Sequence, residues 1–145
     1  MAMTGKCVCG AVRYTIQTDK NEVGACHCEM CRAWSGGVFI GLQAAPRDVA
    51  WEGEENLTIY KSSPWAERAF CGTCGASMFY RVTAPGPHQG QLHIGAGTLD
   101  SYGDAKMTEE IFIDGKPAAY SFAGETRTMT AAEMMALFAP PDAGS

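Results

Sequence analysis

The residues best suited to chemistry in this sequence are three cysteines in one short segment, Cys26, Cys28 and Cys31. Three thiolates spaced C-x-C-x2-C can bind one Zn²⁺ and leave one of its four tetrahedral positions free. A free position is typical of a zinc ion that takes part in a reaction, whereas four protein ligands are typical of one that only stabilises a fold. The segment therefore predicts a reactive zinc site.

The other four of the seven cysteines form two pairs, one near the start and one in the middle of the chain: Cys7, Cys9, Cys71 and Cys74. A glycine directly follows each pair, Gly10 after the first and Gly75 after the second. Glycine adopts positive φ at little cost, and a chain that turns back to aim its amides at a zinc-bound sulfur often needs such a residue. We therefore expect these four thiols to hold a second, structural zinc ion.

Other assignments of the cysteines stay open. Cys28 and Cys31 could join Cys71 and Cys74 in a zinc ribbon, which leaves the other three cysteines without a role. Disulfides would have to pair an odd number of thiols, and no signal peptide or transmembrane run is visible. A redox role for the second and third cysteines of the reactive segment lacks the βαβ context of such motifs. The expectation is a reducing, cytoplasmic setting with metal-bound thiolates.

Composition indicates an ordinary globular protein. With 145 residues, of which 46% are hydrophobic and 19% are charged, we expect a single zinc-binding domain over residues 1–145 with a core of its own. The net charge of −5 and the scattered basic residues argue against binding of nucleic acid. A membrane partner is not expected either, because no apolar run is long enough to span a bilayer.

Short strands are expected to position the cysteines. Alternating or buried apolar residues predict about eight of them, at 12–16, 23–25, 38–42, 56–61, 66–70, 77–82, 91–96 and 110–113. Residues 44–55 are interpreted as a loop around Trp51, and residues 32–37 as a tight connection with one helical turn. Thr130 and Glu133 form a capping-box sequence that predicts a helix over 131–138, ended by Pro140 and Pro141 and followed by a frayed tail. The prediction is a mainly β fold of antiparallel strands with a short C-terminal helix.

Several side chains near the cysteines are candidates for a substrate pocket. Arg32 could pair a substrate carboxylate through two parallel hydrogen bonds, or simply neutralise the thiolates. His27 lies between two ligand cysteines, and alternation points its ring away from the metal, toward a supporting or solvent-exposed position. Arg68 could face either the pocket or solvent. The remaining candidates are interpreted as core or as the face of a strand, with a pocket wall as the alternative for the first two: Trp34, Phe39 and His93.

Four runs of the sequence carry a family resemblance: GKCVCGAVRYTI, CHCEMCRAWSGG, ERAFCGTCGASMFYR and GAGTLD. Together they resemble the glutathione-dependent formaldehyde-activating enzymes, which include the centromere protein V relatives. The resemblance implies an all-β zinc fold called a β-tent, a structural zinc at the two outer pairs, and a second zinc where glutathione and formaldehyde combine, at Cys26, Cys28 and Cys31. The chain departs from the family pattern at Glu110, where relatives often carry a histidine, and at Ala118-Ala119, where they often carry a tryptophan.

The predicted function is that of a zinc-dependent carbon–sulfur lyase, which adds a small thiol such as glutathione to an aldehyde such as formaldehyde or catalyses the reverse reaction. Zinc held by three thiolates is a weak Lewis acid that favours a soft fourth ligand, such as a substrate thiol, over activation of water. We expect two Zn²⁺ per chain, the second partly occupied, with a thiol and an aldehyde as partners; a homodimer is left open. The alternative is a non-catalytic zinc module that binds protein or nucleic acid.

Overall fold

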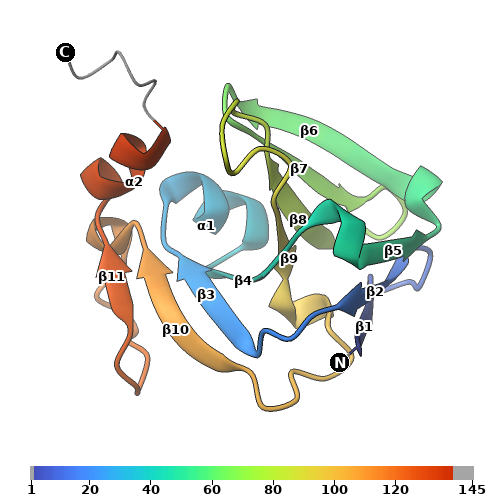
Figure 1. The fold of residues 1–145 in the computed structure, drawn as a ribbon, viewed down its shortest axis with the longest axis horizontal. Coiled ribbons are helices and arrows are strands. Elements are labelled where there is room, and N and C mark those ends of the chain that lie inside the picture. The colour runs from blue at the N-terminus through green and yellow to red at the C-terminus, as the bar shows by residue number, and fades with distance from the viewer. Residues whose placement is uncertain (1, 139–145) are drawn as a thin grey trace.

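The structure of this protein is a computed structural model that describes residues 2–138. Within this range the chain forms eleven β-strands and two α-helices (Figure 1). The mainly β fold expected from the alternating sequence is confirmed, although the strands outnumber the expected ones. Neither α-helix in this range is long and apolar enough to span a membrane.

The strands form two sheets. The small sheet has the order β1-β2-β5, with the bounds β1 (Ala2–Lys6), β2 (Arg13–Gln17) and β5 (Val49–Glu52). The long sheet has the order β11-β10-β3-β4-β9-β8-β7-β6, with the bounds β3 (Glu22–Cys26), β4 (Phe39–Ala44), β6 (Leu57–Ser63), β7 (Ala66–Cys71), β8 (Ser77–Val82), β9 (Leu92–Gly95), β10 (Lys106–Ile111) and β11 (Arg127–Met129). The helices are α1 (Glu29–Ser35) and α2 (Ala131–Phe138), and the 3₁₀ turns are η1 (Pro46–Asp48), η2 (Glu54–Asn56), η3 (Ala96–Thr98) and η4 (Ile113–Gly115).

Not every strand pair is antiparallel, which corrects the sequence prediction. Strand β10 runs parallel to both of its neighbours, β3 and β11. A parallel pair needs a long crossover connection, and the chain between β3 and β10 supplies one because it builds most of the remaining sheet. The parallel register places Glu110 beside Ala25 and Ile111 beside Cys26. It therefore brings β10 against the segment that carries Cys26, Cys28 and Cys31.

The core lies where the two sheets face each other. Its fully buried side chains come from both sheets and include Ile16, Leu42, Met78 and Ile94. Strand β2 shows the alternation that the sequence predicted, with its second and fourth residues buried. Burial of each such side chain contributes about 1.5–3 kcal/mol, so this shared core holds the two sheets together.

Strand β5 was predicted as a loop, and the prediction is wrong because Trp51 is packed between the sheets. Trp51 pairs with Tyr14 across the small sheet. Its ring centroid lies 5.4 Å from that of Tyr14 and 5.2 Å from that of Phe79 in the long sheet. The other two missed strands, β1 and β11, are edge strands of their sheets. A short segment with a mixed sequence becomes a strand here because a neighbour supplies its hydrogen bonds.

The capping box at the start of α2 is confirmed. The Glu133 amide donates to the Thr130 hydroxyl oxygen at 3.2 Å, and the Thr130 amide donates to the Glu133 carboxylate at 3.1 Å. This reciprocal pair satisfies backbone donors that a helix start otherwise leaves free. The predicted helix stop at Pro140 and Pro141 and the frayed tail lie outside the described residues.

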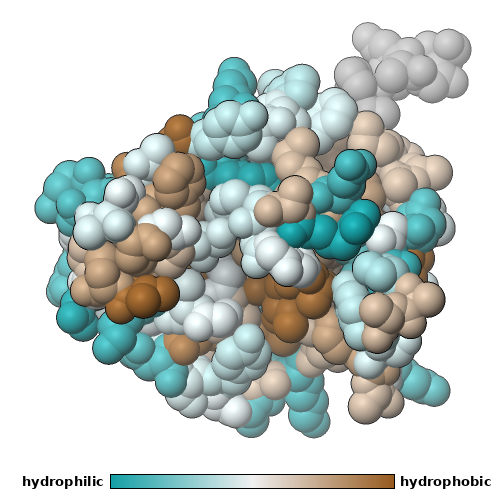
Figure 2. Space-filling model, turned by 180° about the vertical axis from the view of Figure 1, so that it is seen from behind, coloured by the Kyte–Doolittle hydropathy of each residue, from teal (hydrophilic) through white to brown (hydrophobic). Residues whose placement is uncertain are grey.

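Hydrophobic side chains on the face turned away from Figure 1 lie in separate groups among hydrophilic ones (Figure 2). Single large apolar side chains are exposed at several places, including Val8, Ile59, Tyr60 and Trp65. Exposed apolar side chains of this kind are normal on the surface of a globular protein.

Gly5 tests the contact between β1 and β2. It lies opposite Tyr14, and a Cβ at this position would overlap the Tyr14 hydroxyl and the Thr98 carbonyl oxygen. We expect Gly5→Ala to lower the free energy of unfolding by about 1–3 kcal/mol, because overpacking displaces the neighbouring groups. Thermal unfolding measures this as a lower Tm. Gly97→Ala is the control, since a Cβ there meets no atom within 4 Å; equal losses in both variants would contradict the explanation.

Candidate metal centres

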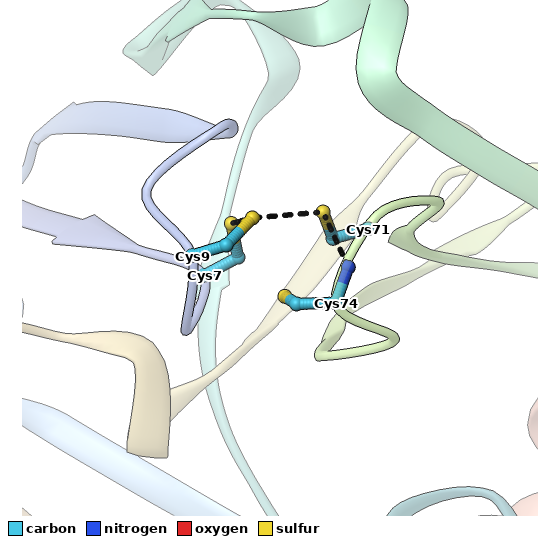
Figure 3. A group of neighbouring side chains, drawn as sticks. All are labelled: Cys7, Cys9, Cys71 and Cys74. Carbon is cyan, nitrogen blue, oxygen red and sulfur yellow. Dashed lines mark hydrogen bonds between the residues drawn. The ribbon is translucent and has the colours of Figure 1, made fainter.

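Four cysteines from two distant parts of the chain converge at one point (Figure 3). The Sγ atoms of Cys7 and Cys9 lie 3.6 Å apart, those of Cys9 and Cys71 lie 3.8 Å apart, and the Sγ atom of Cys74 completes a set within 4.8 Å. Tetrahedral zinc with bonds of about 2.3 Å to sulfur separates neighbouring sulfurs by about 3.8 Å. The group therefore fits a four-sulfur zinc site.

Backbone amides point at the sulfurs of this group. Val12 donates to Cys7 Sγ at 3.3 Å, and Thr73 and Cys74 both donate to Cys71 Sγ at 3.4 Å. Such bonds stabilise the thiolate form that metals bind. The Ala76 amide acts on Cys74 in the same way and is the main reason that the pKa of this thiol falls to about 6.

The glycines after each pair have the conformation that the sequence suggested. Gly10 and Gly75 both have φ of +79°, which glycine adopts without the clash of a side chain. Gly10 donates its amide to the Cys7 carbonyl oxygen, and Gly75 donates to the Cys71 carbonyl oxygen, so each pair sits in a tight turn. The two cysteine pairs thus share one local design.

The second group consists of Cys26, Cys28 and Cys31, whose Sγ atoms also lie within 4.8 Å of one another. Cys26 and Cys31 are buried, whereas Cys28 is half-buried, so access to the sulfurs is from the Cys28 side. Within residues 2–138 no fourth Cys, His, Asp or Glu atom joins the set. The alternative zinc ribbon is not formed, because Cys28 and Cys31 belong to a different group from the pair in the middle of the chain.

Helix α1 places two of these three sulfurs. Cys28 is its N-cap in an extended conformation, and the Cys28 Sγ atom accepts the Cys31 amide at 3.2 Å. The helix ends at Gly36 with φ of +81°, a usual C-terminal residue. The thiols of Cys26 and Cys31 lower the pKa of Cys28 well below its ordinary value, with smaller contributions from the Cys31 amide and from Arg68. The connection predicted as a single turn is in fact this seven-residue helix.

Arg68 is the cation that contacts this group. It lies on β7, is 5% exposed, and donates from Nη1 to Cys31 Sγ at 3.4 Å. Its guanidinium carbon lies 5.1 Å from the Trp34 ring centroid and 5.5 Å from that of Tyr80. The sequence left Arg68 open between pocket and solvent, since only the pairing of β7 with its neighbours shows which face of the strand meets the cysteines.

Arg32, the arginine that follows the three cysteines, is used differently. Its Nε donates to the His27 carbonyl oxygen at 3.1 Å, and the side chain is half-buried. No hydrogen bond from Arg32 to a sulfur is found in the described part of the chain. Its terminal nitrogens therefore remain available to a ligand.

His27 is fully buried and does not join the cysteine group. Its Nδ1 lies 2.8 Å from the Tyr120 hydroxyl, and its Nε2 lies 2.8 Å from the Glu110 carboxylate. A second carboxylate oxygen of Glu110 accepts from the Thr126 hydroxyl at 2.5 Å. The ring thus points away from the candidate metal ligands, as expected, but into a buried hydrogen-bond network and not into solvent. The sequence shows no signal for these partners, which come from later segments.

An aromatic wall borders the three cysteines. The Trp34 and Phe39 rings lie 5.5 Å apart, the Phe39 and Tyr80 rings 5.4 Å apart, and the Tyr80 and His93 rings stack at 4.3 Å. Phe39 is buried core, whereas Trp34 is half-buried at the edge of the wall. Removal from water is the main cause that lowers the pKa of His93 to about 4, so this ring is neutral at pH 7. It packs against Tyr80 on one face of the sheet.

The fold and these two groups define a mainly β protein with two separate sets of candidate metal ligands. Residues 2–115 match the family described as "Glutathione-dependent formaldehyde-activating enzyme". The chain belongs to this family, and the resemblance seen in the four sequence runs is confirmed.

Individual relatives agree with this assignment. An uncharacterized lyase of Schizosaccharomyces pombe is 30% identical over 131 residues, which are 90% of this chain and 93% of that protein. A Halomonas elongata protein, provisionally named a glutathione-dependent formaldehyde-activating enzyme, is 32% identical over 88 residues, 54% of this chain and 55% of its own. A crystal structure of a Rhodobacter sphaeroides protein superposes with a TM-score of 0.56 at 26% identity, covering 68% of this chain and 89% of that one.

The two cysteine groups are expected to respond differently to loss of one sulfur. Cys7→Ser should lose a metal and much of its stability, because structural zinc contributes ~10–16 kcal/mol of apparent binding free energy at neutral pH. Cys28→Ser should keep its fold, because a serine oxygen still caps α1, but lose the second metal. Zinc per chain and Tm measure both effects. Equal destabilisation by the two substitutions would mean that both groups are structural.

Glu110 should make the free energy of unfolding decrease at acid pH. Burial raises the pKa of Glu110, but hydrogen bonds from Thr126 and His27 outweigh it, so the pKa lies below its ordinary value. The stabilisation is therefore present above about pH 4.3, the unfolded value, and is lost as pH falls through the lower folded value. Glu110→Gln should cost about 1–3 kcal/mol at pH 7. The gap in Tm from wild type should narrow below about pH 4.

The neighbouring substitution Glu109→Gln is the matched control for this pH series, since Glu109 is half-buried on the same strand. Any loss of metal in acid is common to all three proteins and cancels in the comparison. A difference in Tm between wild type and Glu110→Gln that stays constant from pH 7 to pH 3 would contradict the stabilisation of the ionised Glu110 carboxylate by its hydrogen bonds.

Proposed function

We propose that this chain is a zinc-dependent carbon–sulfur lyase that binds a small, glutathione-like thiol and adds it to an aldehyde such as formaldehyde, or releases it in the reverse reaction. Membership of the formaldehyde-activating family supports the reaction class. The observation that carries the proposal is the three-sulfur group at Cys26, Cys28 and Cys31, which no fourth Cys, His, Asp or Glu of residues 2–138 completes.

Cys26, Cys28 and Cys31 would hold the reactive zinc, and the four-cysteine group would hold the structural one. All three donors of the reactive site are sulfur, a set that suits zinc and other thiophilic metals. When bound there, zinc supplies the positive charge that keeps a substrate thiol in its thiolate form near neutral pH. The seven cysteines are all used in this assignment.

The surrounding side chains would orient the substrate. The half-buried sulfur of Cys28 marks the approach, and Trp34 packs, like Cys28, against the buried cluster of Cys26, Cys31 and Phe39. Aromatic side chains along this approach exclude water, which strengthens electrostatic contacts within the site. Arg32 is the proposed partner of a substrate carboxylate. Its Nε donates to the His27 carbonyl oxygen, and its two terminal nitrogens are left to bind the carboxylate.

The test is a thiol screen on fully zinc-loaded protein. We expect glutathione or a related thiol to bind in calorimetry, and the number of sulfur neighbours per zinc in X-ray absorption to rise in its presence. Cys28→Ser, which keeps only the structural metal, should show neither change. A second site that stays at three sulfurs in saturating thiol would contradict the proposal and favour a non-catalytic zinc module.

A further inference from the structure

A buried arginine next to the three cysteines has no carboxylate partner in the described structure. Arg68 is 5% exposed, its Nη1 contacts Cys31 Sγ, and its Nε is buried without a hydrogen-bond partner within residues 2–138. The ion pairs found in this range are His27 with Glu110 and Arg81 with Glu67. A buried charge is costly unless an opposite charge compensates it. The sulfurs of the reactive group are the negative charge that Arg68 faces.

The guanidinium of Arg68 is held in this position by two aromatic rings. Arg68 lies directly opposite Tyr80 across the pair of β7 and β8, so the two side chains share one face of the sheet. The ring of Tyr80 and the ring of Trp34 both lie within cation–π distance, at 5.5 and 5.1 Å. Tyr80 is itself stacked on His93 at 4.3 Å. Arg68 therefore cannot follow a departing ligand out to solvent without losing these contacts.

The charges of the site then add up in a particular way. Three thiolates and a divalent metal carry a net charge of −1, and Arg68 brings the total to zero. A thiolate that binds as fourth ligand leaves the group at −1 with Arg68, but would leave it at −2 without Arg68. Like charges repel strongly at the low effective dielectric of a partly buried site. The arginine therefore matters most for a ligand that carries negative charge.

We propose that Arg68 is a specificity-determining residue, the buried counter-charge that lets the three-cysteine site prefer a soft anion, such as a thiolate, over a neutral fourth ligand. The inference rests on the proposed function in one respect, that the three sulfurs hold a divalent metal. Arg32 does not supply this charge, because it bonds to a backbone carbonyl oxygen and contacts no sulfur in the described residues. The assignment thus differs from the carboxylate role proposed for Arg32.

The experiment compares an anionic and a neutral ligand on cobalt-loaded protein. Thiocyanate stays anionic and imidazole stays largely neutral at pH 8, and each is titrated while the visible absorption of Co²⁺ is followed. Arg68→Gln removes the charge but keeps a hydrogen-bond donor for Cys31. We expect thiocyanate affinity to fall at least tenfold and imidazole affinity to change less than threefold, with cobalt per chain unchanged.

Two further variants make the result specific to the charge at this position. Arg68→Lys keeps the charge, and an ammonium group can also lie over the Trp34 and Tyr80 rings, so this variant should bind thiocyanate within about threefold of wild type. Arg81→Gln removes a half-exposed arginine that pairs with Glu67, and should match wild type for both ligands. If Arg68→Gln fails to fold, Arg68→Lys still tests the role of the charge. A tenfold loss of thiocyanate affinity in Arg68→Lys would overturn that role.

The outcomes separate this inference from the proposed function. Equal thiocyanate affinity in wild type and Arg68→Gln, or equal losses for both ligands, would overturn the role of Arg68 while leaving the metal site in place. A wild-type protein that holds only one cobalt ion, or whose second cobalt binds neither ligand, would overturn the inference and the proposed function together.

Discussion

The convergence of four cysteines is the constraint on which the rest of this structure depends. It joins the turn between β1 and β2 to the turn between β7 and β8, and Cys9 and Cys71 meet although 62 positions separate them in the sequence. Two of its sulfurs, those of Cys7 and Cys71, are also part of the main hydrophobic core. A metal bound by these four thiols would therefore stabilise the same contact between the two sheets that apolar packing stabilises.

With the sheets fixed, the segment that carries Cys26, Cys28 and Cys31 lies between groups of opposite charge. On one side, His27 reaches the Glu110 carboxylate on β10, which the parallel pairing with β3 brings alongside. On the other side, Cys31 meets the guanidinium of Arg68 on β7. The first contact holds the backbone between two cysteines and the second faces the sulfurs. The long sheet thus supplies both the position and the electrostatics of the site.

The sequence predicted the parts of this arrangement that local physics decides. Spacing grouped the cysteines, glycine preferences indicated the turns at Gly10 and Gly75, and the capping box located the start of α2. It did not predict the parallel pairing of β10, the strand at Trp51, or the direction of Arg68. Each of these depends on a neighbour distant in sequence, and the residues of a short segment do not determine which strand will pair with it. His27 is an intermediate case, since alternation gave its direction but not its partners.

Cys28 has two structural connections to the three-cysteine site. Its sulfur is a candidate ligand and also the group that caps α1, the helix that carries Cys31. Oxidation of a thiolate to a sulfinic or sulfonic acid is irreversible under most conditions, and Cys28 is the most accessible of the three sulfurs. Damage there would alter the first turn of α1 and displace a second donor with it. Oxidation of the protein in air should thus produce two populations, one with an intact three-cysteine site and one that has lost metal binding there, with few molecules between them.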